Sequence, residues 1–145
     1  MKKVFLSLLL IPFAGIGRLN STHASHGEPV EVRSGEWPIL LQRSIAQSGT
    51  SYSLQFRDMQ VMSTVVMDTL SFPDISQLRY FEKALTVLKT GHNGDIAKFS
   101  DYSIKRADRK YRDTSYILKI KWGLTDFKQS EADILIKTIR GLKFE

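Results

Sequence analysis

A change in hydrophobic period at Pro73 and Asp74 constrains the fold of this chain more than any other feature. Before it, apolar and polar residues alternate over 52–57, as expected for a half-buried strand. After it, apolar residues recur every three or four positions and form one helical stripe: Ile75, Leu78, Phe81, Leu85 and Leu88. Asp74 suits the N-cap and Gly91 suits a left-handed exit, so we predict a helix between them. The basic unit of the chain is therefore a group of strands followed by a helix.

The same order of strands and helix recurs in the second half. We predict strands over 37–46, 52–57, within 61–72, near 96–104 and over 116–122, and a second helix from a capping-box sequence at Ser130 to about Arg140. Two segment pairs look alike at a spacing of about 50 residues, Tyr52–Asp58 with Tyr102–Asp108 and Phe81–Leu88 with Leu135–Leu142. Internal duplication is one interpretation, and the pattern common to any sheet-then-helix unit is the other. We predict an α+β fold, an antiparallel sheet of about five strands with two helices packed on one face.

The N-terminal residues are typical of a targeting segment. Two lysines precede an apolar run over 4–17, and small and polar residues follow it, so residues 1–24 are predicted to be a signal peptide cleaved before Ser25. A retained anchor is the alternative, but the 14-residue run is shorter than a membrane-spanning helix requires. We expect a flexible lead-in over 25–36 and a single domain over 37–145. The protein is then exported, periplasmic or secreted, without a membrane span after cleavage.

The residue types exclude several kinds of chemistry. The 145 residues include no cysteine, which excludes disulfides, zinc–thiolate sites, iron–sulfur clusters and a cysteine nucleophile. Of the three histidines, His26 and His92 follow the predicted cleavage site, and both are interpreted as solvated loop residues. No nucleophile elbow, phosphate-binding glycine loop or dinucleotide fingerprint is present. We therefore predict no catalytic residue, no metal site and no cofactor, although scattered carboxylates leave open a hydrolase with an unrecognised site.

Positive charge is concentrated in one segment. The chain has a formal charge of +6, and without the leader 18 basic residues face 15 acidic ones. Residues 98–121 contain eight basic and three acidic residues, a local charge of +5. The predicted binding surface comprises Lys105, Arg106, Arg109, Lys110, Tyr111, Arg112, Lys119 and Lys121. The alternation places Tyr116 and Trp122 toward the helices and Lys119 and Lys121 on the open face. The alternative is a solvated hairpin whose edge lysines prevent aggregation.

Three functions remain open. The first is a small exported, noncatalytic binding or interaction domain of a bacterial cell envelope, whose partner is an unidentified protein or an anionic polymer. The second is a single-stranded nucleic-acid-binding module, because sheet, helix, sheet, helix with a basic sheet face resembles the topology of Whirly-type and PUR-alpha-type binders. This resemblance transfers no site residue, the first half shows no fourth strand, and a leader argues against intracellular nucleic acid. The third is the hydrolase.

Overall fold

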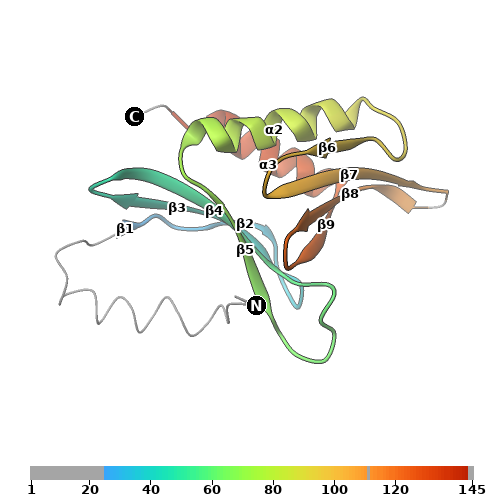
Figure 1. Cartoon of the computed structure of the whole chain (residues 1–145), viewed down its shortest axis with the longest axis horizontal. Helices are drawn as coiled ribbons and strands as arrows, with labels where there is room; N and C mark the ends of the chain where they lie inside the picture. Colours follow the sequence, from blue (N-terminus) through green and yellow to red (C-terminus); the bar gives the residue numbers. More distant parts are fainter. Residues whose placement is uncertain (1–24, 111, 144–145) are drawn as a thin grey trace. The chain divides into compact units, whose positions relative to one another are not determined.

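The chain belongs to the α+β class, and its residues divide into two compact units. The computed structural model describes residues 25–110 and 112–143 (Figure 1). The boundary between the units falls between Ile75 and Ser76. The sequence predicts a single domain over 37–145, whereas contacts within the chain separate it into these two units. The predicted signal peptide, residues 1–24, lies outside the described residues.

The first unit is built on an antiparallel sheet. Its strands β3 (Ile39–Ala46), β4 (Gly49–Arg57) and β5 (Met67–Phe72) follow one another in sequence and in space, and β5 forms one edge of the sheet. The edge strands β1 (Ser25–His26) and β2 (Val30–Arg33) pair with successive stretches of β3. The sheet therefore contains five strands and is four strands wide. The strands expected around 37–46 and 52–57 and within 61–72 are confirmed as β3, β4 and β5.

The segment 25–36, predicted as a flexible lead-in, contains two strands. Val30-Glu31-Val32-Arg33 alternates strictly, and its residue Val32 is buried. This segment supplies the fourth strand of the first half that the sequence pattern alone does not reveal. Both halves of the chain thus contain four strand positions followed by a helix.

The two faces of the first sheet differ in polarity. Register places Leu41, Leu54 and Leu70 opposite one another across β3, β4 and β5, and all three are buried. The neighbouring row on the other face consists of Gln42, Ser53 and Ser71. The polar face of this sheet is therefore made largely of neutral serine, threonine and glutamine side chains.

The second unit contains a second antiparallel sheet, so the predicted single sheet of about five strands is wrong. Its strands β6 (Ile96–Lys98), β7 (Tyr102–Arg109), β8 (Arg112–Ile120) and β9 (Leu124–Lys128) lie in sequence order. The segment expected to form one strand near 96–104 forms β6, a turn and the start of β7. The strand expected over 116–122 begins earlier and ends at Ile120, and β9 is an additional strand.

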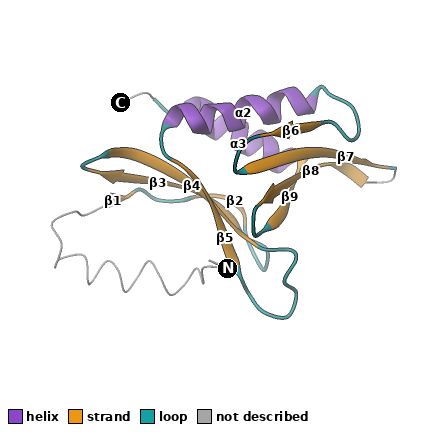
Figure 2. Ribbon diagram, viewed as in Figure 1, coloured by secondary structure: helices purple, strands orange, loops and turns teal. Residues whose placement is uncertain are grey.

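Two helices cover one face of the second sheet, α2 (Ile75–Lys89) and α3 (Gln129–Gly141) (Figure 2). The Phe81 ring of α2 lies 5.8 Å from the ring of Tyr102 and 6.3 Å from that of Phe127. The helices are joined by an ion pair in which Arg140 Nε donates to Glu82 Oε1 at 2.7 Å. Within the described residues, neither helix has the length and apolar character needed to cross a bilayer. The prediction of two helices on one sheet face is confirmed for this unit.

The helix ends differ in detail from the prediction. The N–H of Lys128 donates to Glu131 Oε2 at 2.7 Å, so the N-cap of α3 is Lys128, two residues before the expected cap at Ser130. Gly91 is not in the left-handed region. A Cβ at this position would lie 2.5 Å from Asp95 Oδ2. A side chain at this position would therefore require the Asp95 carboxylate to shift, whereas the backbone conformation is one that other residues adopt.

The halves correspond at a different spacing from the predicted one. β3 and β7 both contain eight residues, β4 and β8 both contain nine, and each pair begins 63 residues apart. The predicted match of Tyr52–Asp58 with Tyr102–Asp108 aligns β4 with β7, and is therefore wrong as a structural correspondence. The order of four strands and a helix is nevertheless the same in both halves.

Candidate functional site

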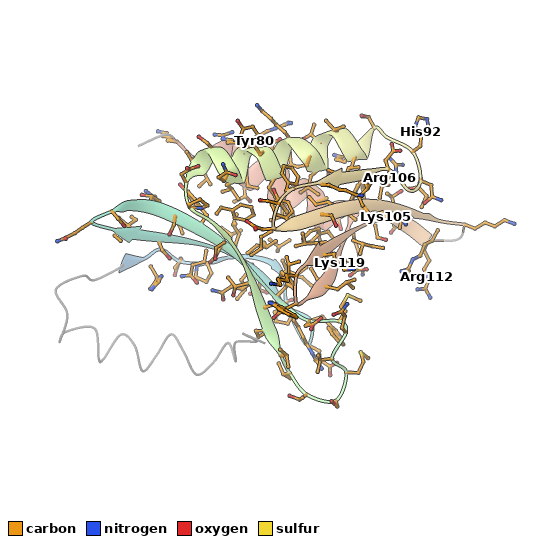
Figure 3. All side chains as sticks on the ribbon, in the orientation of Figure 1. Tyr80, His92, Lys105, Arg106, Arg112 and Lys119 are labelled. Carbon is orange, nitrogen blue, oxygen red and sulfur yellow. The ribbon has the colours of Figure 1, made fainter. Side chains whose placement is uncertain are left out.

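The face of the second sheet that points away from the helices is defined by its register. Ile104 and Leu118 are directly opposite each other and fully buried on the helix side. Because neighbouring residues of a strand point to opposite faces, Lys105 and Lys119 belong to the other side. Figure 3 shows both lysines on the side of the sheet away from α2.

Four lysines from four different strands converge on this open face. Lys98, Lys105 and Lys119 come from β6, β7 and β8, and Lys128 ends β9. We call these four residues the basic face. All four side chains are exposed, and within residues 25–110 and 112–143 none of them forms an ion pair or a side-chain hydrogen bond. Their charge is therefore available to an external anion.

The register also gives the spacing of the basic face. Ser103 lies between Lys98 and Lys119 in one row across the sheet, and Lys105 belongs to the next row. Strands about 4.8 Å apart and same-face residues about 6.7 Å apart place Lys98, Lys105 and Lys119 at intervals of about 8 to 10 Å, and Lys128 about 12 Å from Lys105. Ser103 and Ala107 flank Lys105 along β7, whereas Ile96 and Ile117 lie beside it on the neighbouring strands. The lysine side chains of this surface therefore project beyond the shorter side chains between them.

Arg106 does not belong to this surface, which corrects the prediction. It lies on the helix side, opposite Tyr116. Its Nη1 donates to the carbonyl oxygens of Leu88 at 2.9 Å and Lys89 at 2.7 Å, at the C-terminal end of α2. A cation at this position satisfies helix carbonyls that have no partner within the helix. Arg106 is therefore a structural residue, and only 15% of its side chain is exposed.

A second interaction of Arg106 stabilises the start of the hairpin. Its Nε donates to Asp108 Oδ1 at 2.9 Å, and the Thr114 hydroxyl donates to the same oxygen at 3.0 Å. The hydrogen bond from Arg106 holds the pKa of Asp108 below its ordinary value, and the bond from Thr114 acts in the same direction. The same pairing raises the pKa of Arg106. This acid thus neutralises the structural arginine and leaves the basic face unchanged.

One end of the open face is a polar depression of about 510 Å³. It is lined by Arg109, Arg112, Asp113, Ser115, Asp126 and Lys128. Arg109 and Arg112 lie directly opposite each other beside a β-bulge in β7. Asp113 and Asp126 are separated by four register positions along adjacent strands, about 13 Å of strand length, so they are not adjacent as a carboxylate pair.

Aromatic residues lie at the other end. The rings of Phe99 and Tyr102 are stacked, with centroids 4.4 Å apart and an interplanar angle of 17°. They line a depression of about 460 Å³ together with Lys98, Lys119 and Lys121. Burial raises the pKa of the Tyr102 phenol, and the Asp101 carboxylate adds to this effect, so the phenol stays neutral.

Trp122 adds another aromatic surface near this end. The sequence predicts that it points toward the helices, but β8 ends at Ile120 and the Trp122 side chain is 46% exposed. The Lys121 Nζ lies 5.0 Å from the centre of its ring. Lys121 therefore belongs to the turn after β8, where it lies next to an exposed aromatic ring rather than in the strand.

The predicted binding residues thus occupy several places. Lys105 and Lys119 are on the basic face, Arg109 and Arg112 are in the polar depression, and Lys110 is in the hairpin turn. Tyr111 lies outside the described residues. The predicted surface left out Lys98, although it begins the basic segment, and Lys128, which lies beyond that segment; both join the face through the β6–β7 and β8–β9 pairings.

The histidines do not form a site together. His26 lies in β1, where its Nδ1 is 2.9 Å from the Ser44 hydroxyl, so it is not in a flexible segment. The His92 side chain is 93% exposed. No cluster of three or more metal-ligating side chains occurs among the residues that the structure describes.

Comparison with known proteins gives no family assignment. No family model matches the sequence, and no curated protein matches it at a significant level. The geometry of the second sheet therefore carries the functional argument.

Proposed function

We propose that this protein is a noncatalytic binding domain of the bacterial cell envelope, and that it binds an extended anionic polymer on the basic face. The observation that carries the proposal is the convergence of Lys98, Lys105, Lys119 and Lys128, which have no ion-pair partner among the described residues. A ligand with regularly repeated negative charges matches such a row of cations. Binding is then dominated by release of counterions and weakens steeply as salt is added.

The proposal is supported by the contrast between these lysines and the other cations of the unit. Lys89 pairs with Asp133, Arg140 with Glu82, and Arg106 with Asp108. These cations act within the fold. The lysines of the basic face contribute nothing comparable to it, and mutual repulsion between like charges is unfavourable without a ligand.

Single-stranded nucleic acid is a second candidate ligand, favoured by two specific observations. β2 gives the first half its fourth strand, which removes one departure from the Whirly-type and PUR-alpha-type order. The Phe99–Tyr102 stack lines a depression together with Lys98 and Lys119, and the exposed Trp122 lies next to Lys121, so bases could stack on a ring close to these lysines. The predicted leader still argues for an envelope polymer as the first candidate.

The decisive experiment is a salt-dependent titration of the purified protein with two probes, a sulfated or uronic-acid polysaccharide and a single-stranded oligonucleotide. A double variant, Lys105→Ser with Lys119→Ser, should weaken polysaccharide binding at low salt by about tenfold or more. The matched control, Lys137→Ser with Lys143→Ser, removes the same charge from exposed residues outside the basic face and should change affinity little.

The outcomes separate the candidates. Equal loss in both double variants would show that net charge, rather than the basic face, controls binding. Tighter binding of the oligonucleotide, reduced further by Trp122→Ser, would favour the nucleic-acid candidate. No binding of either probe at low salt would overturn both. The intact mass of the protein purified from the envelope tests export, since cleavage before Ser25 leaves 121 residues.

A further inference from the structure

The outer edge of the second sheet is formed by β6, whose outward backbone groups have no partner in the described chain. The Asp95 carbonyl accepts from Arg106 N–H at 2.9 Å, and the Phe99 N–H donates to the Tyr102 carbonyl at 2.8 Å. Hydrogen-bonding directions alternate along an antiparallel strand, so residues 95, 97 and 99 face β7. The N–H and C=O groups of Ile96 and Lys98 consequently point to the outside, where another strand can pair with them.

An apolar groove follows this edge on the helix side. It has a volume of about 490 Å³ and runs between α2 and β6. Four of the apolar residues that line it are exposed, Tyr80 at 51%, Val87 at 68%, Ile96 at 47% and Phe99 at 36%. Ile96 borders the groove from the edge, because register places its side chain on the same side of the sheet as Lys105. Its polar residues include one cation, Lys83, and one anion, Asp95. An edge with free backbone groups and adjacent exposed apolar residues is suited to a strand-pairing interface.

We propose that β6 pairs antiparallel with β6 of a second copy of this chain, about a two-fold axis at Ala97. In this register Ile96 lies opposite Lys98 of the other copy, and their outward N–H and C=O groups can exchange hydrogen bonds on both sides of the axis. Ala97 lies opposite itself in a non-hydrogen-bonded pair, where Cα atoms come to about 4.5 Å and a small side chain is favourable.

The charges of the groove are also compatible with contact between two identical grooves. An isologous interface brings the same surface together twice, so each groove offers a lysine and an aspartate to its counterpart. Val87 and Tyr80, exposed on α2 beside the edge, would face the equivalent helix of the other copy. The pairing removes an open sheet edge and covers apolar side chains in one step.

The dimer inference does not depend on the proposed ligand. Its consequence for the proposed function is that two basic faces become one, because both would belong to a continuous eight-stranded sheet. Self-association without a ligand tests the inference, whereas polymer affinity tests the function, so either can fail alone.

Disulfide trapping tests the register directly, because the chain has no cysteine of its own. Under mild oxidation, Ala97→Cys should give a covalent dimer, since a Cα separation of about 4.5 Å lies within the range of disulfides. Ile134→Cys, an exposed position on α3, is the control for random collisions and should remain monomeric. Equal cross-linking at the two positions, or none at Ala97, would overturn the proposed register.

Sedimentation velocity of the unmodified protein tests the surface independently. A concentration-dependent dimer is expected, and Val87→Lys should raise its dissociation constant about tenfold by burying an unmatched charge. Ile134→Lys should leave it unchanged. A monomer at every concentration would refute the proposal, and so would a dimer whose dissociation constant does not respond to Val87→Lys. If a peptide from another protein were found paired with β6 in place of the second copy, the proposal would also be refuted.

Discussion

The two halves of the described chain share an order of strands but carry opposite net charge. Residues 25–75 contain three basic and six acidic residues, a net charge of −3, whereas residues 76–145 contain fifteen and nine, a net charge of +6. The polar row of the first sheet consists of Gln42, Ser53 and Ser71. The corresponding side of the second carries the lysines of the basic face. The comparison teaches that topology determines which positions face away from the apolar side, while the residues placed there determine the kind of ligand.

The halves also differ in how their strands continue. Nine residues, 58–66, link β4 to β5, but three residues, 121–123, link β8 to β9. Moreover, both α2 and α3 pack within the second unit, although α2 follows directly after the first sheet in sequence. The two halves are therefore alike in strand order and different in what covers the sheet.

The largest effect is expected when the same change in net charge is made on the first sheet in one variant and on the second sheet in another. Replacing Lys105, Lys119 and Lys128 by serine changes the charge by −3 and should weaken binding of an anionic polymer about a hundredfold, on roughly 1 kcal/mol per lysine. The variant in which glutamate replaces Ser53, Thr69 and Ser71 has the same net charge as the lysine variant. Its affinity for the polymer should fall far less. Affinity and its salt dependence are measured by fluorescence titration. Similar losses in both variants would show that the two faces do not differ in function.

A smaller effect separates the stability of the two units. Arg140→Gln removes the partner of Glu82, whose side chain is only 6% exposed and keeps a hydrogen bond from Thr86. We expect the free energy of unfolding of the second unit to fall by about 2 kcal/mol, since a buried carboxylate loses its charged partner. Lys137→Gln, on the same helix, is the control. Urea unfolding monitored at Trp122 and Trp37 compares the units, and a loss confined to the Trp37 signal would contradict the assignment.

The smallest expected effect is a pH dependence specific to the second unit. The pKa of Asp108 is lowered in the fold, so its carboxylate stabilises the protein above the ordinary value near 3.8. This contribution is lost as the pH falls through the lower folded value. Unfolding free energies measured between about pH 3 and pH 7 should therefore decline less steeply in Asp108→Asn than in the unaltered protein. Identical slopes would show that the bond to Arg106 does not stabilise the fold.

Local periodicity was sufficient to predict the strongest elements. The stripe from Ile75 to Leu88 predicts α2, and alternation over 52–57 predicts β4, because each element buries one face of its own. β2 was missed although Val30-Glu31-Val32-Arg33 alternates, and β9 was missed because Leu124-Thr125-Asp126-Phe127 shows no alternation of apolar and polar residues. They are short edge strands, so their formation depends on pairing with a neighbour and not on their own sequence.

The candidate site was predictable only in part, because it too depends on how distant strands pair. Strand parity could have removed Arg106 from the binding surface, since it is two residues after the apolar Ile104 and must share its face. The basic segment already contained Lys98, but nothing local showed that Lys98 and Lys128 share a face with Lys105 and Lys119, because that depends on the register of three strand pairs. That two sheets form, rather than one, depends likewise on contacts between distant residues.

The position of α2 has a consequence for the order in which the chain acquires its structure. Its Phe81 packs against Tyr102 and Phe127, so all of these partners are synthesised after the helix itself. The ion-pair partner of Glu82, Arg140 near the C-terminus, is synthesised later still. With synthesis at about 5 to 20 residues per second, the apolar stripe of α2 is complete several seconds before its last partner exists. Through that interval it is the segment of the nascent chain most in need of protection from aggregation.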